Sequence, residues 1–331
     1  MKVIKFIFII TLLNLNCVYL KADSFNEWLI SFKVKAIKDG ISEKTLNEVM
    51  NDVIFLEKVI EYDRYQPEFY EDTNTYIGKR SSNLKLKNGL NLYNKYSSSI
   101  DNIAIEFDLE KELLLALMGI ETNYGKYLGK MDILSSLATL SYDKRRSEFF
   151  TQELLILLRL IDKQIVNYKT LRGSWAGAFG NFQFMPSTIK NYAIDFDKND
   201  KINLKSIDDS FASAANYLNK MGWKKDAPCF KKIKLNKDIP IKYLIYSARG
   251  LEIKKKYKHL KKYIINSNNL NVDDNALVTI ITPDKEIVDN PNIHDPAYLV
   301  FSNYELILKW NRSLRFALAV CTLKNKFKNE L

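Results

Sequence analysis

The sequence predicts a mainly α-helical protein of the α+β class, with a small mixed or β segment inserted before the last helix. Apolar residues recur at helical spacing from residue 25 to about residue 102, as in Trp28, Phe32 and Ala36. After Trp223 the pattern changes to short runs rich in β-branched residues, which is typical of strands. The 331 residues are 47% apolar and 27% charged, which is ordinary for a globular chain and excludes disordered and collagen-like proteins.

The first 22 residues have the pattern of a secretion signal. Lys2 and Lys5 supply positive charge, and residues 6–15 are almost entirely apolar, a run too short for a membrane span. Cleavage after Ala22 would release a soluble exported protein. Cys17 offers an alternative, in which the exported chain carries a lipid anchor. We expect export in either case.

Changes of pattern divide the chain into five segments. The first helices are expected to break at Pro67. Six of the eleven glycines lie between Gly119 and Gly180, and glycine among helices marks sharp turns and close backbone approach. A last helix is expected from Ser313 to Lys326. The predicted segments are 1–22, a signal peptide; 23–100, an N-terminal helical region; 101–225, the core; 226–300, a small α/β segment; and 301–331, a strand and helix that complete the core.

Net charge and cysteine content narrow the function classes only modestly. The net charge of +11 suits a polyanionic partner such as nucleic acid, anionic lipid or a cell wall that carries carboxylates. The basic residues are scattered apart from local runs, and no nucleic-acid motif accompanies them, so we expect no nucleic-acid partner. Cys229 and Cys321 lie far apart without metal-binding spacing, which leaves two buried thiols or one disulfide as alternatives.

The segment from Asp108 to Gly125 is predicted to be a helix that carries a buried carboxyl group. Asp108 is a suitable N-cap, and Gly125 is placed to end the helix. Leu114 and Leu117 share one helix face with Glu121, which therefore continues an apolar stripe near the negative end of the helix dipole. Both surroundings disfavour ionisation, which suits a general acid that still holds its proton near neutral pH. The alternative is a buried Glu held by an arginine or by backbone amides.

A second stretch, residues 173–188, combines a tight glycine turn with polar and aromatic side chains. It places three glycines within eight residues and Pro186 at an expected helix start. Ser174 and Gln183 offer hydrogen bonds, and aromatic residues including Phe184 offer flat apolar faces, a mixture that fits a sugar. The ending that a phosphate loop requires is absent. A helix–helix turn packed on aromatics is the alternative.

These two stretches carry a resemblance to a known family. Gly119-Ile-Glu-Thr-Asn-Tyr-Gly125 and Gly173-Ser-Trp-Ala-Gly-Ala-Phe-Gly-Asn-Phe-Gln-Phe-Met-Pro186 closely resemble the membrane-bound lytic murein transglycosylase B family. The likeness continues in collinear order to Leu308-Lys-Trp-Asn-Arg-Ser313. The resemblance implies a lysozyme-like helical core, flanked by an N-terminal helical domain and a small β-containing domain.

The resemblance also implies a reaction. Lytic murein transglycosylases cleave the β-1,4 bond between N-acetylmuramic acid and N-acetylglucosamine in periplasmic peptidoglycan without water, leaving a 1,6-anhydromuramoyl end. Glu121 matches the catalytic glutamate, which would act as the single general acid and base. Saccharide-binding or intermediate-stabilising roles are implied for Ser174, Gln183, Phe184, Tyr217 and Asn311.

Three other functions are compatible with the sequence. A lysozyme-type hydrolase on the same fold would need a second carboxylate, which Asp132, Glu148 or Glu153 could supply after folding. A non-catalytic peptidoglycan-binding protein is disfavoured by the intact motif around Glu121, and nucleic-acid binding is the most remote alternative. We expect a monomer whose partners are glycan strands, with other cell-wall enzymes as further candidates.

A degenerate calcium loop follows the second stretch, where some members of the resembled family carry an EF-hand-like loop. Asp195, Asp197 and Asn199 occupy positions one, three and five, which suits calcium. Asp200 replaces the turn-forming glycine at position six, and Ser206 replaces the bidentate carboxylate at position twelve. We expect weak calcium binding at most and no cofactor required for activity, with a solvated acidic loop as the alternative.

Overall fold

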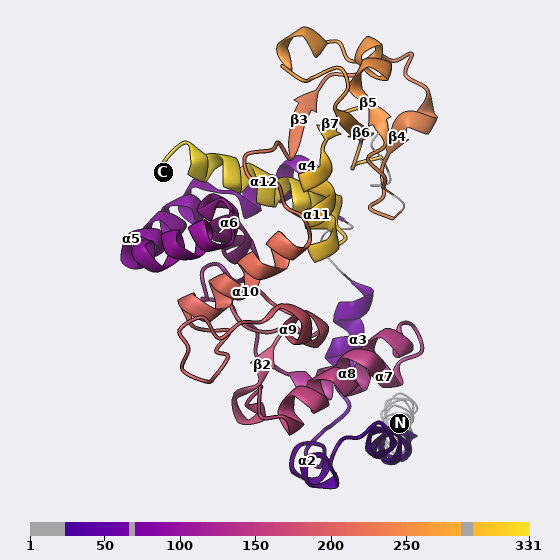
Figure 1. The fold of residues 1–331 in the computed structure, drawn as a ribbon. Coiled ribbons are helices and arrows are strands. Elements are labelled where there is room, and N and C mark those ends of the chain that lie inside the picture. The colour runs from indigo at the N-terminus through magenta and orange to yellow at the C-terminus, as the bar shows by residue number, and fades with distance from the viewer. Residues whose placement is uncertain (1–23, 66–69, 250, 286–293) are drawn as a thin grey trace, which may run out of the picture. The chain divides into compact units, whose positions relative to one another are not determined.

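Helices predominate in this chain, and a small sheet forms late in the sequence. The computed structural model describes residues 24–65, 70–249, 251–285 and 294–331. The predicted signal peptide with Cys17, and the predicted helix break at Pro67, lie outside the described residues. The mainly α fold with a β-containing segment before the last helices is confirmed (Figure 1). No helix in the described ranges combines the length and the apolar character that crossing a membrane requires.

The described residues form two compact units. One contains residues 24–65 and 128–191, and the other contains residues 70–127 and 192–331. This division cuts across the predicted core of residues 101–225. The physical reason is that the helices within 128–191 pack on the N-terminal helices of their own unit, whereas Glu121 belongs to the second unit.

The first unit is helical and centres on two packed helices, α7 and α8. Its elements are a helix over 24–38, α2 (Glu43–Val49), α3 (Glu57–Arg64), β1 (Met131–Asp132), α7 (Ile133–Tyr142), α8 (Ser147–Asp162), the 3-10 turn η2 (Tyr168–Thr170), β2 (Arg172–Gly173) and all but the last residue of α9 (Pro186–Tyr192). Helix α3 packs on α7, and α2 packs on α8. Asp63 of α3 is buried and pairs with Arg145 and Arg146, which fastens α3 to the turn between α7 and α8.

Among the described residues, the second unit contains six helices, and one of them, α6, carries Glu121. They are α4 (Thr73–Arg80), α5 (Asn83–Glu106), α6 (Lys111–Thr122), α10 (Ile207–Lys220), α11 (Ser302–Trp310) and α12 (Leu314–Lys328). Helices α5, α10 and α12 all contact α6. The predicted last helix is confirmed as α12, and the Ser313 hydroxyl caps it by accepting the Phe316 N–H at 3.2 Å.

Helix α6 begins later than the sequence pattern predicts, and Asp108 is not its N-cap. Asp108 adopts a left-handed φ of 50°, and the residue before the helix is Glu110. The Glu110 carboxylate is buried and makes no capping bond, because it accepts the Trp223 indole N–H and pairs with the Lys324 ammonium, each at 2.6 Å. This buried cluster fixes the start of α6 against α12.

A small sheet fills the segment between α10 and α11. Its strands are β3 (Phe230–Ile233), β4 (Leu244–Ile245), β5 (Lys255–Lys256), β6 (Leu277–Ile281) and β7 (Ala297–Val300), with the 3-10 turns η3 (Ile241–Tyr243), η4 (Tyr257–His259), η5 (Lys261–Tyr263) and η6 (Ser267–Asn269) between them. The strand order is β3-β7-β6-β4, and β5 also pairs with β6. Strands β6 and β7 run antiparallel with Ile280 opposite Leu299, and both side chains are fully buried. A disulfide between Cys229 and Cys321 joins the start of this segment to α12, which decides between the two alternatives for the cysteines.

Candidate active site

Glu121 occupies the last turn of α6, at the end of a buried helix face. Leu114 and Leu117 are fully buried and Met118 nearly so, which confirms the apolar stripe. Glu121 itself is only partly exposed, one residue before the helix ends. Its carboxyl group therefore lies where an apolar interior meets the surface of the unit, a position open to a ligand yet shielded on one side.

Trp310 is a partner of Glu121 that the sequence did not predict. Its indole Nε1–H donates a hydrogen bond to Glu121 Oε1 at 3.0 Å. Trp310 ends α11, almost two hundred residues further along the chain, and the sequence assigned it no role of its own. The only sequence signal was its place directly before Asn311, within a stretch that resembles the family.

An aromatic ladder of three side chains leads to the carboxyl group. The rings of Tyr192 and Tyr217 have centroids 4.6 Å apart, and those of Tyr217 and Trp310 have centroids 5.1 Å apart. The Tyr217 hydroxyl donates to the carbonyl oxygen of Lys309 at 3.3 Å. Burial, together with the neighbouring Tyr192, raises the pKa of Tyr217, so it stays a neutral hydrogen-bonding group. Aromatic faces next to a carboxyl group are suited to a sugar ring that must be held while a proton moves.

Asn311 directly follows Trp310, at the end of α11. Its backbone is extended, with φ of −141° and ψ of 122°, and its N–H bonds to the Ile307 carbonyl at 3.0 Å. The second unit therefore gathers Glu121, Tyr217 and Asn311 around Trp310, because α6, α10 and α11 converge there.

Three successive residues with left-handed backbone conformation end α6. The first of them, Asn123, ends the helix in place of the predicted Gly125. Asn123, Tyr124 and Gly125 have φ of 49°, 62° and 79°, so the helix stops at Thr122, three residues before Gly125. A Cβ at Gly119 would lie 2.5 Å from the Tyr124 hydroxyl oxygen, so this helix position requires glycine. Lys85 donates to the Gly119 carbonyl at 2.6 Å, and the same carbonyl also accepts the Asn123 N–H at 3.1 Å.

The remaining predicted sugar-binding residues lie in the first unit, where they shape a turn. The Ser174 hydroxyl accepts the Ala178 N–H at 3.0 Å. The Gln183 side-chain amide donates to the carbonyls of Leu128 at 3.2 Å and Gly180 at 3.0 Å. Both side chains are partly exposed, so each holds the turn and keeps further hydrogen-bonding capacity at the surface.

Phe184 does not present a flat apolar face. Its side chain is 3% exposed and packs against Phe182, with ring centroids 6.1 Å apart. Its backbone pairs with Phe179 in a short bridge. The aromatic rings at these positions therefore belong to the packing of the turn, while Trp175 is partly exposed. Pro186 begins α9 as predicted.

The candidate second carboxylates all lie in the first unit, and two of them have structural roles. Asp132 caps α7 by accepting the Ser135 N–H at 2.8 Å. Glu153 is 4% exposed and accepts the N–H and the hydroxyl of Ser187 at 2.9 and 2.6 Å, at the start of α9. Glu148 is exposed in the first turn of α8.

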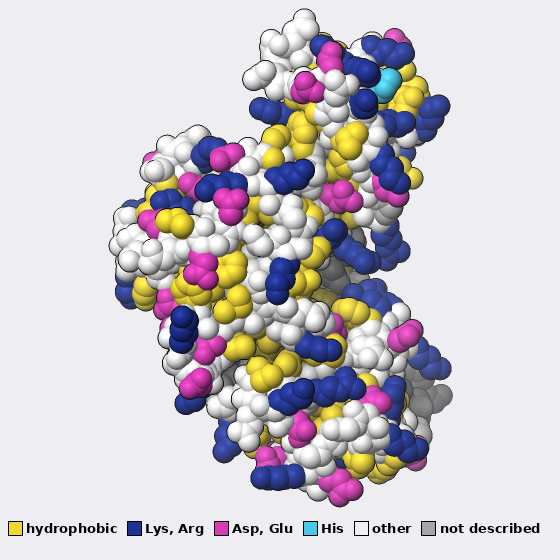
Figure 2. Space-filling model, viewed as in Figure 1, with side chains coloured by type: hydrophobic (Ala, Val, Ile, Leu, Met, Phe, Trp, Pro, Cys, Tyr) yellow, Lys and Arg dark blue, Asp and Glu magenta, His cyan; other side chains and the backbone are white. Residues whose placement is uncertain are grey.

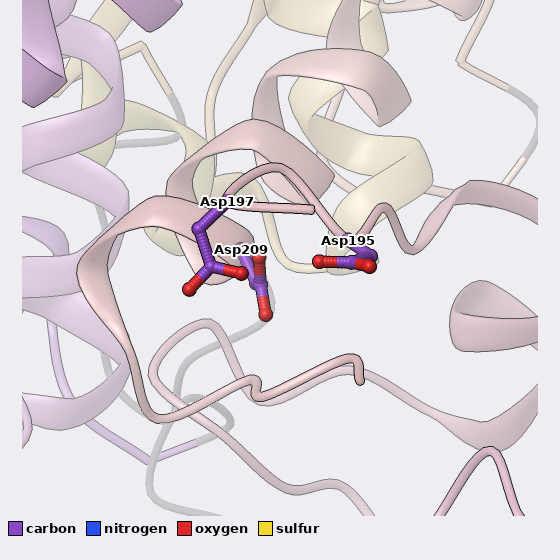
Figure 3. A group of neighbouring side chains, drawn as sticks. All are labelled: Asp195, Asp197 and Asp209. Atoms are coloured by element: carbon purple, nitrogen blue, oxygen red, sulfur yellow. The ribbon is translucent and has the colours of Figure 1, made fainter. Parts of the chain in front are cut away.

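The predicted calcium loop gathers carboxylates, and Asp209 joins the predicted Asp195 and Asp197. Ligand oxygens of Asp195, Asp197 and Asp209 all lie within 4.8 Å of one another (Figure 3). The side-chain oxygen of Asn199, the third predicted ligand, accepts the Lys201 N–H at 3.0 Å within the same loop. Asp209 comes from α10, fourteen residues after Asp195, beyond the twelve positions of an ordinary EF-hand loop.

Asp209 anchors this loop. Its carboxylate is fully buried and accepts the N–H groups of Phe196 at 2.8 Å and Asn203 at 2.7 Å. Desolvation, followed by the charge of Asp209, raises the pKa of Asp197, as expected where like charges crowd together. A calcium ion binds oxygens at about 2.4 Å, so oxygens up to about 4.8 Å apart can share one ion. The donor set fits a calcium ion in chemistry and spacing.

Comparisons with known proteins agree with this geometry. The family model described as "Transglycosylase SLT domain" matches residues 24–325. The membrane-bound lytic murein transglycosylase B of Escherichia coli (strain K12) is 38% identical over 141 residues; the match spans 42% of this chain and only 39% of that protein. SltB3 from Pseudomonas aeruginosa in complex with NAG-NAM-pentapeptide has a TM-score of 0.80 and 29% identity, covering 92% of this chain and 79% of that one. The Escherichia coli lytic transglycosylase Slt35 in complex with calcium has a TM-score of 0.74 and 25% identity, covering 91% and 93%. This chain belongs to the transglycosylase SLT domain family, and its predicted resemblance to the lytic murein transglycosylase B proteins is confirmed.

Proposed function

We propose that this chain is an exported lytic murein transglycosylase with Glu121 as its single acid and base. One observation carries the proposal: a half-buried carboxyl group lies at the end of an apolar helix face, with an indole N–H on one oxygen and an aromatic ladder beside it. The substrate would be the β-1,4 bond between N-acetylmuramic acid and N-acetylglucosamine in peptidoglycan. The family and the solved relatives bound to glycan fragments support this choice.

The first half of the reaction is a proton transfer. Glu121 Oε1 accepts the Trp310 N–H, so we assign the transferable proton to Oε2. That proton passes to the bridging oxygen as the bond from this oxygen to C1 of the muramoyl residue breaks. The bonding electrons stay on the oxygen, and the N-acetylglucosamine leaves with a free 4-hydroxyl group. C1 becomes electron-poor, and Glu121 becomes a carboxylate.

The second half closes a ring within the muramoyl residue. The Glu121 carboxylate takes the proton of the 6-hydroxyl group while that oxygen bonds to C1. The product is the 1,6-anhydromuramoyl end, and Glu121 is protonated again for the next cycle. No water is consumed, so one carboxyl group suffices where a hydrolase requires two.

The other predicted residues would bind the strand. Tyr217 and Asn311 lie beside Trp310 in the same unit, which suits contacts to the sugars nearest the cleaved bond. Ser174 and Gln183 would offer a hydroxyl and an amide to sugar or N-acetyl groups. Phe184 can contribute only by shaping the turn, since its ring is buried.

Replacement of Glu121 by glutamine tests the proposal directly. Glutamine keeps an oxygen for the Trp310 N–H but has no proton to give, so turnover of purified sacculi should fall about 10²–10⁴-fold, the usual contribution of a general acid. Binding to sacculi should persist. Glu48→Gln, an equally conservative change at an exposed glutamate of α2 with no proposed role, is the matched control and should retain full turnover.

Mass spectrometry of the released fragments identifies the bond chemistry. Anhydromuramoyl ends support the proposal. Reducing muramoyl ends would establish a lysozyme-type hydrolase instead, and undiminished turnover in Glu121→Gln would remove Glu121 from the mechanism. Retained binding without turnover in the unmodified chain would indicate a non-catalytic wall-binding protein.

We further propose that the loop binds calcium through Asp195, Asp197 and Asp209. The crowded carboxylates support this, and the calcium complex of the Escherichia coli relative is consistent with it. Calcium would hold the loop together and raise the midpoint of thermal unfolding. Asp197→Asn should abolish that shift while leaving the buried Asp209 contacts intact. An equal midpoint with calcium and with a chelator would contradict calcium binding.

The chain is proposed to act outside the cytoplasm, as a monomer in contact with glycan strands. The amino-terminal pattern of charge and apolar residues supports export, and the relative from Escherichia coli is described as membrane-bound. Fractionation of cells that express the full chain tests the location. Labelling with a fatty acid analogue, compared with Cys17→Ser, tests the lipid anchor.

A further inference from the structure

The basic residues are scattered along the chain, but acidic residues balance them almost everywhere except in one part of the small sheet segment. Residues 231–262 hold twelve Lys and Arg and only two acidic residues, a net charge of +10 out of the +11 of the whole chain. The rest of the protein is therefore nearly neutral. We call the exposed Lys and Arg side chains of residues 231–262 the lysine surface.

The lysine surface is solvent-facing, and few of its cations are paired with an acidic residue. Every Lys and Arg in this range is exposed except Lys261, which is half-buried. Within the described residues, Lys254 pairs with Glu252 and Lys261 pairs with Asp274. Four ammonium groups also lie over tyrosine rings, which are neutral and do not compensate their charge: Lys242, Lys255, Lys261 and Lys262. Figure 2 shows Lys and Arg side chains crowding over the strands drawn at the top of the view, with few Asp and Glu among them. Such a surface attracts a polyanion.

Protection of the sheet edges explains only part of this charge. Lys231 and Lys232 lie on β3, at one edge of the sheet, and lysines at edges prevent strands of other molecules from pairing there. Three further lysines lie in turns outside the paired strands and cannot protect an edge: Lys237, Lys242 and Lys258. The additional lysines require another explanation.

Exposed apolar side chains accompany the lysines. Ile241 and Ile265 are 61% and 69% exposed, and Leu277 on β6 is 53% exposed next to Lys256 of β5 in the strand register. Tyr246 is also exposed, and the Lys285 ammonium lies 4.1 Å from its ring centroid. Large aliphatic and tyrosine side chains among lysines are the composition of surfaces that lie on membranes, where the apolar groups enter the headgroup region.

We propose that the lysine surface docks this protein on a bilayer that contains anionic phospholipid. The positive charge attracts the anionic headgroups. The apolar side chains of Ile241, Ile265 and Leu277 would be stabilised by entering the bilayer, whereas contact with a hydrated polymer of sugars and peptides would leave them in water. This contact is independent of the amino-terminal segment. A single acyl chain holds a protein on a membrane only weakly, and a polybasic surface is one of the second signals that make the attachment stable.

Vesicle co-sedimentation of the full chain tests the proposal, with Cys17→Ser in every sample to exclude acylation. Vesicles of phosphatidylcholine with 30% phosphatidylglycerol are compared with phosphatidylcholine alone. The test variant carries Lys232→Gln, Lys237→Gln, Lys256→Gln and Lys258→Gln, four exposed side chains. The control variant loses the same charge at four exposed lysines of the first unit: Lys38→Gln, Lys44→Gln, Lys58→Gln and Lys163→Gln.

Each lysine close to an anionic bilayer strengthens binding about fivefold. If at least two of the four replaced lysines contact the bilayer, the test variant should bind at least about 25-fold more weakly than the parent. The control variant should bind within about threefold of the parent, and 0.5 M salt should release the parent. Equal binding of the two variants, or equal binding to neutral vesicles, would overturn the proposal. The proposal would also be overturned if the test variant lost binding to purified sacculi but bound vesicles as well as the parent. Matching thermal unfolding of the variants confirms that they are folded.

Discussion

Removal of the indole N–H from Trp310 isolates the contact that positions Glu121. Trp310→Phe keeps an aromatic ring in the ladder, next to Tyr217 at 5.1 Å, but loses the donor that lies 3.0 Å from Glu121 Oε1. A hydrogen bond to a charged group contributes about 1.5–3 kcal/mol, which corresponds to about 10–150-fold in a rate if the bond is fully formed in the transition state. We expect kcat for sacculus digestion to fall by about 10–100-fold.

The matched control is the same change at Trp223. Its indole N–H donates to the Glu110 carboxylate at 2.6 Å, so Trp223→Phe also removes one indole donor from one glutamate of the second unit. Glu110 is buried and pairs with Lys324, so this variant should lose about 1–3 kcal/mol of unfolding free energy and keep kcat within about twofold. Trp310→Phe should show the opposite pattern, with nearly unchanged stability.

The assay measures the initial rate of anhydromuropeptide release, and urea unfolding gives the stability of each variant. Wild-type kcat in Trp310→Phe would refute the assignment of Trp310 as the positioning residue for Glu121. Equal losses of kcat in both variants would show that folding, and not the position of the carboxyl group, explains the effect.

Three stability predictions follow from contacts in the second unit, each measured by urea unfolding. Gly119→Ala should destabilise by about 1–3 kcal/mol, since its Cβ would meet the Tyr124 hydroxyl at 2.5 Å, and Tyr124→Phe in the same chain should recover part of the loss. Lys324→Met should lower the free energy of unfolding by about 3–5 kcal/mol, because the buried carboxylate of Glu110 loses its cation. A loss below about 1 kcal/mol would contradict a buried ion pair. Cys229→Ser should cost about 2–5 kcal/mol, since it opens a covalent loop of 92 residues, and dithiothreitol should then have no further effect.

Local sequence patterns located the helices and strands well, because they depend on neighbouring residues. Apolar spacing predicted the buried face of α6, and Ser313 predicted the start of α12. The ends of α6 were wrong by two or three residues. Asp108 and Gly125 have the chemistry of terminal residues, but Leu109 is buried and Asn123 adopts the left-handed conformation first, which moves both ends inward.

In the candidate active site, too, the sequence predicted what depends on neighbouring residues and missed the contacts between distant segments. Glu121 was predicted from its own helix, since its place on an apolar face is a local property. Trp310 and Asp209 were missed as partners, because each meets its group only after helices distant in sequence have packed together. Phe184 was expected to offer its ring, and packing against Phe182 buries that ring instead.

The sequence alone determined the composition of this protein, the helical and strand periodicities, the carboxyl group on an apolar stripe and the concentration of lysines after residue 230. Those properties follow from the order of neighbouring residues. Only the tertiary structure decided that an indole from α11 holds Glu121, that Asp209 completes the acidic loop, and that two distant cysteines are joined. Contacts of this kind are set by the packing of α6, α10, α11 and α12, and no periodicity within a single segment encodes which residues of another helix will face it.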